Sequence, residues 1–168
     1  MIKYAEFSEC KKYRYLLVRG WDETRKPVVC IGLNPSTANA EDDDTTITNT
    51  CKLLDTMGYG GLYMMNLYGI ISSKPEVLRS HPNPVGDNDR WIRDITKGQD
   101  IIFCWGSFKQ AEYRAKKLIK EFPNAMCFGK TPKGHPLHPL AATIWQKSKC
   151  KLQPFLTGSE LEAKHKEG

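Results

Sequence analysis

The residues best suited to chemistry begin with a segment in which a carboxamide stands between a glycine and two hydroxyls, Gly32-Leu33-Asn34-Pro35-Ser36-Thr37. Gly32 permits close approach of the backbone to a ligand, and Pro35 restrains Asn34 toward an extended conformation. A carboxamide held in this way can orient a water molecule or hydrogen-bond to the edge of a base. Asn34 can equally bond to its own backbone in a turn, so the segment marks a candidate site and leaves its chemistry open.

An acidic run, Asp42-Asp43-Asp44, follows shortly after this segment. One interpretation is structural: Asp44 caps a helix, and the neighbouring acids favour the positive end of its dipole. The other is chemical: a carboxylate acts as a general base or binds a metal ion. Three acids exceed what a cap requires, and both interpretations stay open.

Two imidazoles three residues apart, His135 and His138, are each followed by proline. Such a histidine can stabilise negative charge on a leaving group or transfer a proton. The alternative is a loop in which both have only structural roles. No other His or Cys has a spacing that would complete a metal site, so we expect no metal ion and no cofactor.

The elements that must position these residues follow from alternating apolar patterns. Strands are predicted over 12–20, 27–33, 61–68, 100–105 and 125–128, and helices after Asp44, near Asn88, from Ser107 to Phe122 and over 141–147. This order predicts an α/β fold, a three-layer α/β/α domain over residues 1–156 with a central, mainly parallel four-stranded sheet. Residues 157–168 are predicted to be a flexible polar tail.

In open α/β sheets, ligands bind beyond the carboxyl ends of the strands. This rule selects four loops, at residues 32–38, 66–73, 106–107 and 129–140. They add further candidate substrate-binding residues to those already named: Asn66, Tyr68, Trp105, Gly106 and Ser107.

Charge and composition indicate which kinds of molecule the protein binds. The net charge is +6, and residues 109–151 hold ten Lys or Arg against two acids. This indicates a polyanionic partner, DNA or a nucleotide, although a solvated helix face would give the same excess. Lys109, Lys130 and Lys133 are the candidate phosphate contacts. Six cysteines without a C-x-x-C pair predict reduced structural thiols, and no apolar run predicts a membrane span.

The ordered motifs resemble the uracil-DNA glycosylase superfamily. Residues 29–35 resemble its first catalytic motif in the mismatch-specific and thymine-type branch, residues 64–67 the strand end that reads a flipped base, residues 103–107 its Trp-Gly segment, and residues 138–140 its second catalytic motif. A closer likeness is to an uncharacterised bacterial and phage family, a domain of unknown function numbered 1643. Its signature resembles Gly-Leu-Asn-Pro-Ser-Thr-Ala, Asp-Asp-x-Thr, Trp-Gly and His-Pro-Leu, all of which stand in this sequence.

The resemblance implies an N-glycosylase-like enzyme that hydrolyses a base–sugar bond in a flipped-base pocket. We expect the protein to lie in the cytoplasm of a bacterium or phage-infected cell, because the sequence has neither a membrane span nor a signal-peptide core. The sequence leaves the oligomeric state open, with a monomer favoured. Asn34 would position water, Asp43 or Asp44 would act as base or stabilise the sugar cation, and His138, with His135 in reserve, would stabilise the departing base. Asn66 would read the base edge and Tyr68 would stack on it.

Two positions depart from the superfamily pattern. Ser36 stands where glycine is usual, and Leu140 stands where a phosphate-gripping serine is usual. These departures favour a first alternative, a module that recognises a modified base or DNA without cutting it. A second alternative is a metal-dependent nucleotide hydrolase or transferase that uses Asp42–Asp44.

Overall fold

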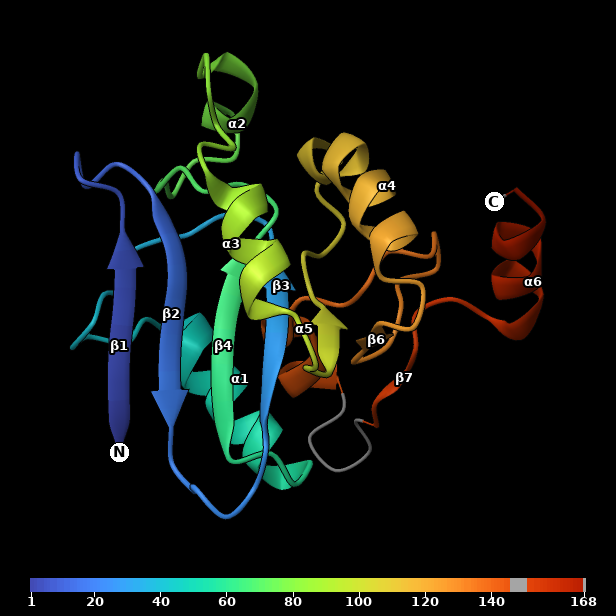
Figure 1. Cartoon of the computed structure of the whole chain (residues 1–168), viewed down its shortest axis with the longest axis horizontal. Coiled ribbons are helices and arrows are strands. Elements are labelled where there is room, and N and C mark those ends of the chain that lie inside the picture. The colour runs from blue at the N-terminus through green and yellow to red at the C-terminus, as the bar shows by residue number, and fades with distance from the viewer. Residues whose placement is uncertain (146–150, 168) are drawn as a thin grey trace.

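The computed structural model describes residues 1–145 and 151–167, and the chain forms a mixed sheet flanked by helices (Figure 1). Seven strands lie in the order β1-β2-β4-β3-β5-β6-β7. Their bounds are Ile2–Phe7 (β1), Arg14–Gly20 (β2), Pro27–Gly32 (β3), Gly61–Asn66 (β4), Ile101–Phe103 (β5), Met126–Cys127 (β6) and Gln153–Pro154 (β7).

The four adjacent strands β4, β3, β5 and β6 are parallel, whereas β1, β2 and β7 pair antiparallel at the two sides. The α/β class is confirmed, but the prediction of a four-stranded sheet is wrong. β1 and β7 lie at the edges and are largely exposed, so they lack the continuous apolar run that identifies a buried strand. β2, predicted as a strand, joins the same sheet.

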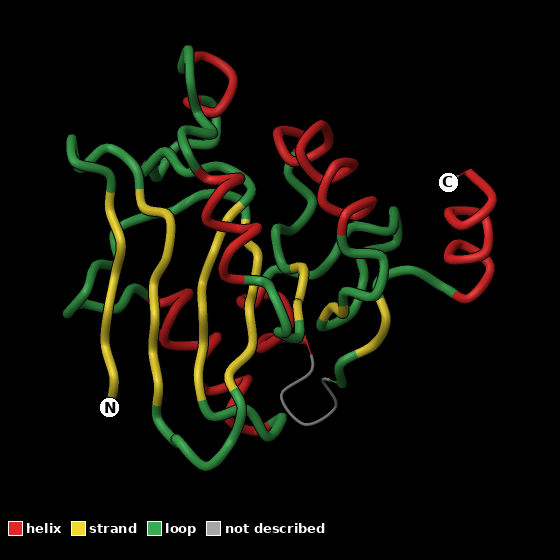
Figure 2. The backbone as a smooth tube through the Cα atoms, viewed as in Figure 1, coloured by secondary structure: helices red, strands yellow, loops and turns green. Residues whose placement is uncertain are grey.

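Helices cover both faces of the sheet, as the alternation of side chains along β3 requires. Val28 and Cys30 pack in a cluster with Ile47 and Leu54 of α1 (Thr45–Thr56), which is accompanied by α5 (Pro139–Trp145). Val29 and Ile31 face the opposite cluster, under α3 (Asn88–Ile95) and α4 (Glu112–Glu121). Figure 2 distinguishes the helices, in red, from the strands, in yellow. The result is a three-layer arrangement.

The remaining helices refine the sequence-based boundaries. A short helix α2 (Val77–Ser80) lies in the long loop after β4. The helix predicted from Ser107 begins at Glu112, after the 3-10 turn Lys109–Ala111. The segment predicted as a flexible tail contains α6 (Gly158–Glu167). The predicted helix over 141–147 begins earlier, at Pro139, and its last two residues lie outside the described part.

Parallel pairing places the ends of β3, β4 and β5 at one edge of the sheet. The loops that leave this edge carry the first polar segment, Asn66 and the Trp-Gly segment. Leu67 donates its backbone N–H to Gly32 and Tyr68 donates to Leu33, so the loops after β3 and β4 continue side by side beyond the sheet. This is the edge at which the candidate site forms.

Candidate functional site

A cavity of about 240 Å3 lies beyond the ends of β3 and β4. Pockets for drug-sized ligands usually occupy about 300–1,000 Å3, so this one suits a single small group. Its polar lining comes from segments far apart in the sequence: Arg14, Asn34, Ser36, Asp44, Thr46, Asn66, Ser72, Ser73 and His138. Four residues predicted to act on a substrate, Asn34, Asp44, Asn66 and His138, therefore share one cavity.

Asn34 fastens two loops together at the cavity wall. Its Nδ2 donates to the backbone oxygens of Ser72 (2.8 Å) and Pro35 (3.1 Å), with a longer contact to Ile70 (3.4 Å). Both amide hydrogens are therefore used by the backbone, and the side-chain oxygen is the group left for a ligand or a water molecule. Both sequence interpretations of Asn34, the turn and the site, are compatible with this geometry.

Asn66 is almost fully buried, 3% exposed, and stands at the end of β4. Among the described residues its carboxamide makes no hydrogen bond, although the residue lines the cavity. Its backbone oxygen is fixed by Asn88 Nδ2 at 2.6 Å. A carboxamide offers two donors and two acceptor sites, so the Asn66 side chain keeps its hydrogen-bonding capacity for a ligand.

Each of the three aspartates of the acidic run interacts with a different partner. Asp44 caps α1, with Oδ1 accepting from the Ile47 N–H at 2.9 Å, and it also lines the cavity. Asp43 Oδ1 instead pairs with Arg19 Nε at 2.7 Å and does not line the cavity. Asp42 accepts from Asn39 Nδ2 at 3.2 Å. The structure thus brings Asp44 into the site and leaves Asp43 outside it.

His138 reaches the cavity from the loop before α5. The Leu140 N–H donates to His138 Nδ1 at 3.2 Å, so the neutral ring carries its proton on Nε2. Burial lowers the pKa of His138, and the Asp44 carboxylate partly opposes that shift. At neutral pH the side chain is therefore a neutral imidazole that can donate one hydrogen bond through Nε2.

Gly106 connects the His138 loop with the loop after β5. It has a φ of +77°, the left-handed region that glycine adopts without strain. Its N–H donates to the Pro136 oxygen at 3.0 Å, and a Cβ at this position would lie 3.5 Å from His138 Cβ. Gly106 is absent from the lining, so its contribution is to position its neighbours.

Arg14 and Phe108 are among the lining residues that the sequence analysis did not select. Arg14, 3% exposed, opens β2 and lines the cavity. Phe108 lines it as well and is 41% exposed, an aromatic ring at a cavity wall that is still open to solvent. A signal existed for each: an arginine among apolar strand residues, and an aromatic residue next to the Trp-Gly segment.

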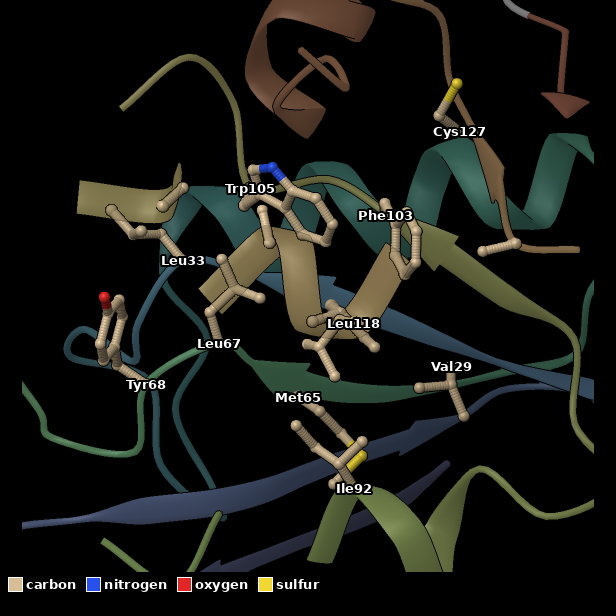
Figure 3. Close-up of a cluster of buried hydrophobic side chains, with 14 of the residues drawn as sticks. Val29, Leu33, Met65, Leu67, Tyr68, Ile92, Phe103, Trp105, Leu118 and Cys127 are labelled. Carbon is tan, nitrogen blue, oxygen red and sulfur yellow. The ribbon is translucent and has the colours of Figure 1, made fainter. Parts of the chain in front are cut away.

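Several predicted binding residues lie away from the cavity. Tyr68 is buried in the cluster under α4, where its hydroxyl donates to the Gln110 oxygen at 2.8 Å. Trp105 lies in the same cluster, in contact with Phe103 (Figure 3). Pro35 is buried and Thr37 is exposed, and neither appears in the lining, whereas Gly32 and Leu33 do.

A separate depression gathers four other predicted residues. It is lined by Ser107, His135, Lys109 and Lys133 together with Glu112 and Thr131. Lys130 lies over the Phe155 ring at 5.0 Å from its centroid. The basic stretch is partly neutralised by the fold, because Arg114 and Lys117 both pair with Asp89. Lys147 and Lys149 lie outside the described residues.

Metal-binding side chains do not gather in the part of the chain that the structure describes, where no three of His, Cys, Asp and Glu come together. The five described cysteines are free, and Cys150 lies outside that part. Burial raises the pKa of Cys30, which disfavours its reactive thiolate form. Among the described helices, none has the length and apolar character needed to cross a bilayer.

Comparison with known proteins gives little beyond a family. No curated protein matches the chain. One solved structure, Est1E from Butyrivibrio proteoclasticus, is 14% identical, with 86% of this chain and 70% of that chain covered and a TM-score of 0.39. The family described as "Protein of unknown function (DUF1643)" matches residues 14–140, which include every polar residue of the cavity lining. The chain belongs to this family.

Proposed function

We propose that the cavity receives a nucleobase and that the chain hydrolyses the bond between this base and its sugar, in DNA or in a modified nucleotide. The observation that carries the proposal is the shared cavity of Asn34, Asp44, Asn66 and His138. Together they supply the groups that the reaction needs: a base-edge reader, a carboxylate, a neutral hydrogen-bond donor and an acceptor for water.

Asn66 is the residue suited to reading the base. Its buried carboxamide has no partner among the described residues, and a pyrimidine edge offers complementary donors and acceptors. An unpaired buried carboxamide is costly, so a matching base is favoured over one with the opposite donor pattern. Phe108 provides an aromatic face on which the base can stack.

Asp44 and His138 divide the charge that develops in the reaction. One oxygen of Asp44 caps α1, and the second is available to a cationic sugar or to the attacking water. Water adds at C1′, the C1′–N bond breaks, and the bonding electrons leave with the base. The proton released by water passes to Asp44. His138 Nε2–H donates to the base anion as it departs, and Asn34 orients the water through its side-chain oxygen.

The partner suggested by this proposal is nucleic acid or nucleotide. The depression lined by Lys109 and Lys133 provides cationic groups for backbone phosphates. If the substrate is DNA, binding should weaken as salt rises, with a slope set by the number of phosphates neutralised. Two lysines would give a modest slope rather than the steep dependence of an extended DNA-binding surface.

The test is base release from single-stranded and duplex oligonucleotides, and from the matching nucleotides. They would carry uracil, mismatched thymine or a modified pyrimidine, and free base and abasic sites would be measured. Asp44→Asn should slow release at least about a hundredfold, since it removes the carboxylate. Asp42→Asn, which alters a neighbouring carboxylate outside the cavity, is the matched control and should retain the wild-type rate. Absence of release from every substrate by folded protein would reject hydrolysis.

A binding module that does not cut is the second candidate. It is favoured because two proposed catalytic side chains already have structural roles: Asn34 Nδ2 donates to backbone oxygens, and Asp44 caps a helix. In that case oligonucleotide binding would weaken in Asn66→Ala, and the wild-type protein would show no base release. The metal-dependent alternative gains no support, because the three aspartates diverge.

A further inference from the structure

Three arginines are buried in this protein, and one of them lacks a carboxylate partner. Arg14, Arg19 and Arg114 are 3%, 1% and 4% exposed. Arg19 pairs with Asp43, and Arg114 pairs with Asp89. Arg14 forms no ion pair with any described residue. A buried charge normally requires a partner of opposite sign, so the exception points to a counter-charge that comes from outside the chain.

The hydrogen bonds of Arg14 lead to the same conclusion. Nη1 donates to the Ala38 oxygen at 2.8 Å. Nε is buried without a hydrogen-bond partner, and Nη2 makes no hydrogen bond within the described part of the chain. Burial lowers the pKa of Arg14 to about 10, so the guanidinium stays charged at neutral pH. Asp44 lies near enough to favour that charge, but its Oδ1 is held by the cap of α1.

We infer that the cavity binds a ligand bearing an anionic oxygen group, a carboxylate or a phosphate, which accepts hydrogen bonds from Arg14. The inference rests on the proposed function and narrows its substrate class to a base that itself carries a carboxylate or to a nucleotide whose phosphate enters the cavity. Ser36, Thr46 and Ser73 line the same space, and their hydroxyls can donate to the remaining anionic oxygens. A neutral pyrimidine would leave the positive charge of the guanidinium without a counter-charge.

The experiment compares matched ligands that differ in one anionic group. Calorimetric titration would measure uracil against 5-carboxyuracil, thymidine against thymidine 5′-monophosphate, and inorganic phosphate alone. The charged member of one pair should bind at least about tenfold more tightly, as a charge-assisted hydrogen bond allows. Preference within the first pair identifies a carboxylated base. Preference within the second, with or without binding of phosphate alone, identifies a phosphate group.

Two variants connect the preference to Arg14. Arg14→Met should abolish it, whereas Lys52→Met, which removes an exposed charge outside the cavity lining, should keep it. Without ligand, Arg14→Met should unfold at a temperature equal to or above that of the wild type, because an unpaired buried charge has been removed. Arg19→Met should unfold at a lower temperature than the wild type, since it leaves the Asp43 carboxylate without its ion-pair partner.

Equal binding of charged and neutral ligands by the wild type would overturn the inference, as would a preference that persists in folded Arg14→Met. If Arg14→Met does not fold, the wild-type comparison decides alone. Because the titrations use free ligands and require no cleavage, they separate this inference from the proposed hydrolysis. Release of neutral bases at the wild-type rate by Arg14→Met would reject the anionic ligand and leave base excision standing.

Discussion

Gly32 and Asn66 are partners in the parallel register of β3 and β4, and the Asn66 carboxamide occupies the space that a side chain at position 32 would need. A Cβ on Gly32 would lie 2.8 Å from Asn66 Oδ1 and 2.8 Å from Met64 Cε. Both distances are much shorter than an ordinary van der Waals contact of 3.4–4 Å. The glycine of the first loop therefore determines where the proposed base-reading side chain can lie.

Gly32→Ala should displace the Asn66 carboxamide and weaken ligand binding by about tenfold or more, because a misplaced carboxamide loses its hydrogen bonds to the base. Titration with the ligand found in the matched-pair experiment would measure this. Gly158→Ala is the control, since a Cβ there meets nothing within 4 Å. Unchanged affinity in folded Gly32→Ala would show that Asn66 does not contact the ligand.

Asp43 is expected to act on stability rather than on catalysis. Asp43→Asn removes the charge paired with Arg19, which is 1% exposed and keeps backbone contacts to Val18 and Asn39. Breaking such a pair should lower the free energy of unfolding by about 3 kcal/mol. Denaturant titration would show this loss, while Asp42→Asn should change it by less than about 0.5 kcal/mol. If Asp43→Asn kept its stability but lost its activity, Asp43 would have to be a catalytic residue.

The buried elements of this fold could be predicted because their sequence signals are local. Val28–Ile31 is a continuous apolar run of a strand covered on both faces, and Asp44 caps α1 as its position predicts. β1 and β7 could not be predicted in this way. They are short or exposed edge strands whose pairing depends on neighbours distant in the sequence.

The candidate site was predictable where strand ends carry polar residues, as at Asn34 and Asn66. It was not predictable where a residue type has two uses. Tyr68 lies two residues beyond Asn66, the last residue of β4, yet its ring turns into the core under α4. Arg14 belongs to an antiparallel strand, β2, so the rule for parallel strand ends does not select it. Arg14 is singled out because it is buried without a carboxylate partner among the described residues, and only the packed structure shows this.

Phe108, rather than Tyr68, should contribute aromatic stacking. Phe108→Ala removes a ring that lines the cavity and should weaken base binding by about five- to a hundredfold, the range measured for base–aromatic stacking. Tyr68→Phe removes only the hydroxyl that donates to Gln110, so it should cost about 1 kcal/mol of stability and leave affinity unchanged. Affinity and thermal unfolding of both variants would be measured. The reverse pattern, with affinity lost in Tyr68→Phe alone, would contradict the placement of both rings.

The protonation of His138 should couple stability to pH. Burial lowers its pKa in the folded protein below the ordinary 6.5, and Asp44 only partly opposes that effect. The unfolded chain therefore binds the proton at a higher pH than the folded chain does. It follows that the stabilisation is fully present above pH 6.5 and is lost as the pH falls from 6.5 toward the folded value.

His138→Gln lacks this titration, so the stability of wild type minus that of the variant should decrease between pH 7.5 and pH 5.5. The slope is at most about 1.4 kcal/mol per pH unit, the limit for one proton. Denaturant unfolding of both proteins across this range would measure it. The same protonation adds a cation to the cavity that Arg14 also lines, so binding of a negatively charged base is not expected to fall in parallel with stability. A difference in stability that is constant with pH would show that the imidazole has the same pKa in the folded and unfolded chains, and would contradict a His138 pKa lowered by burial at the cavity wall.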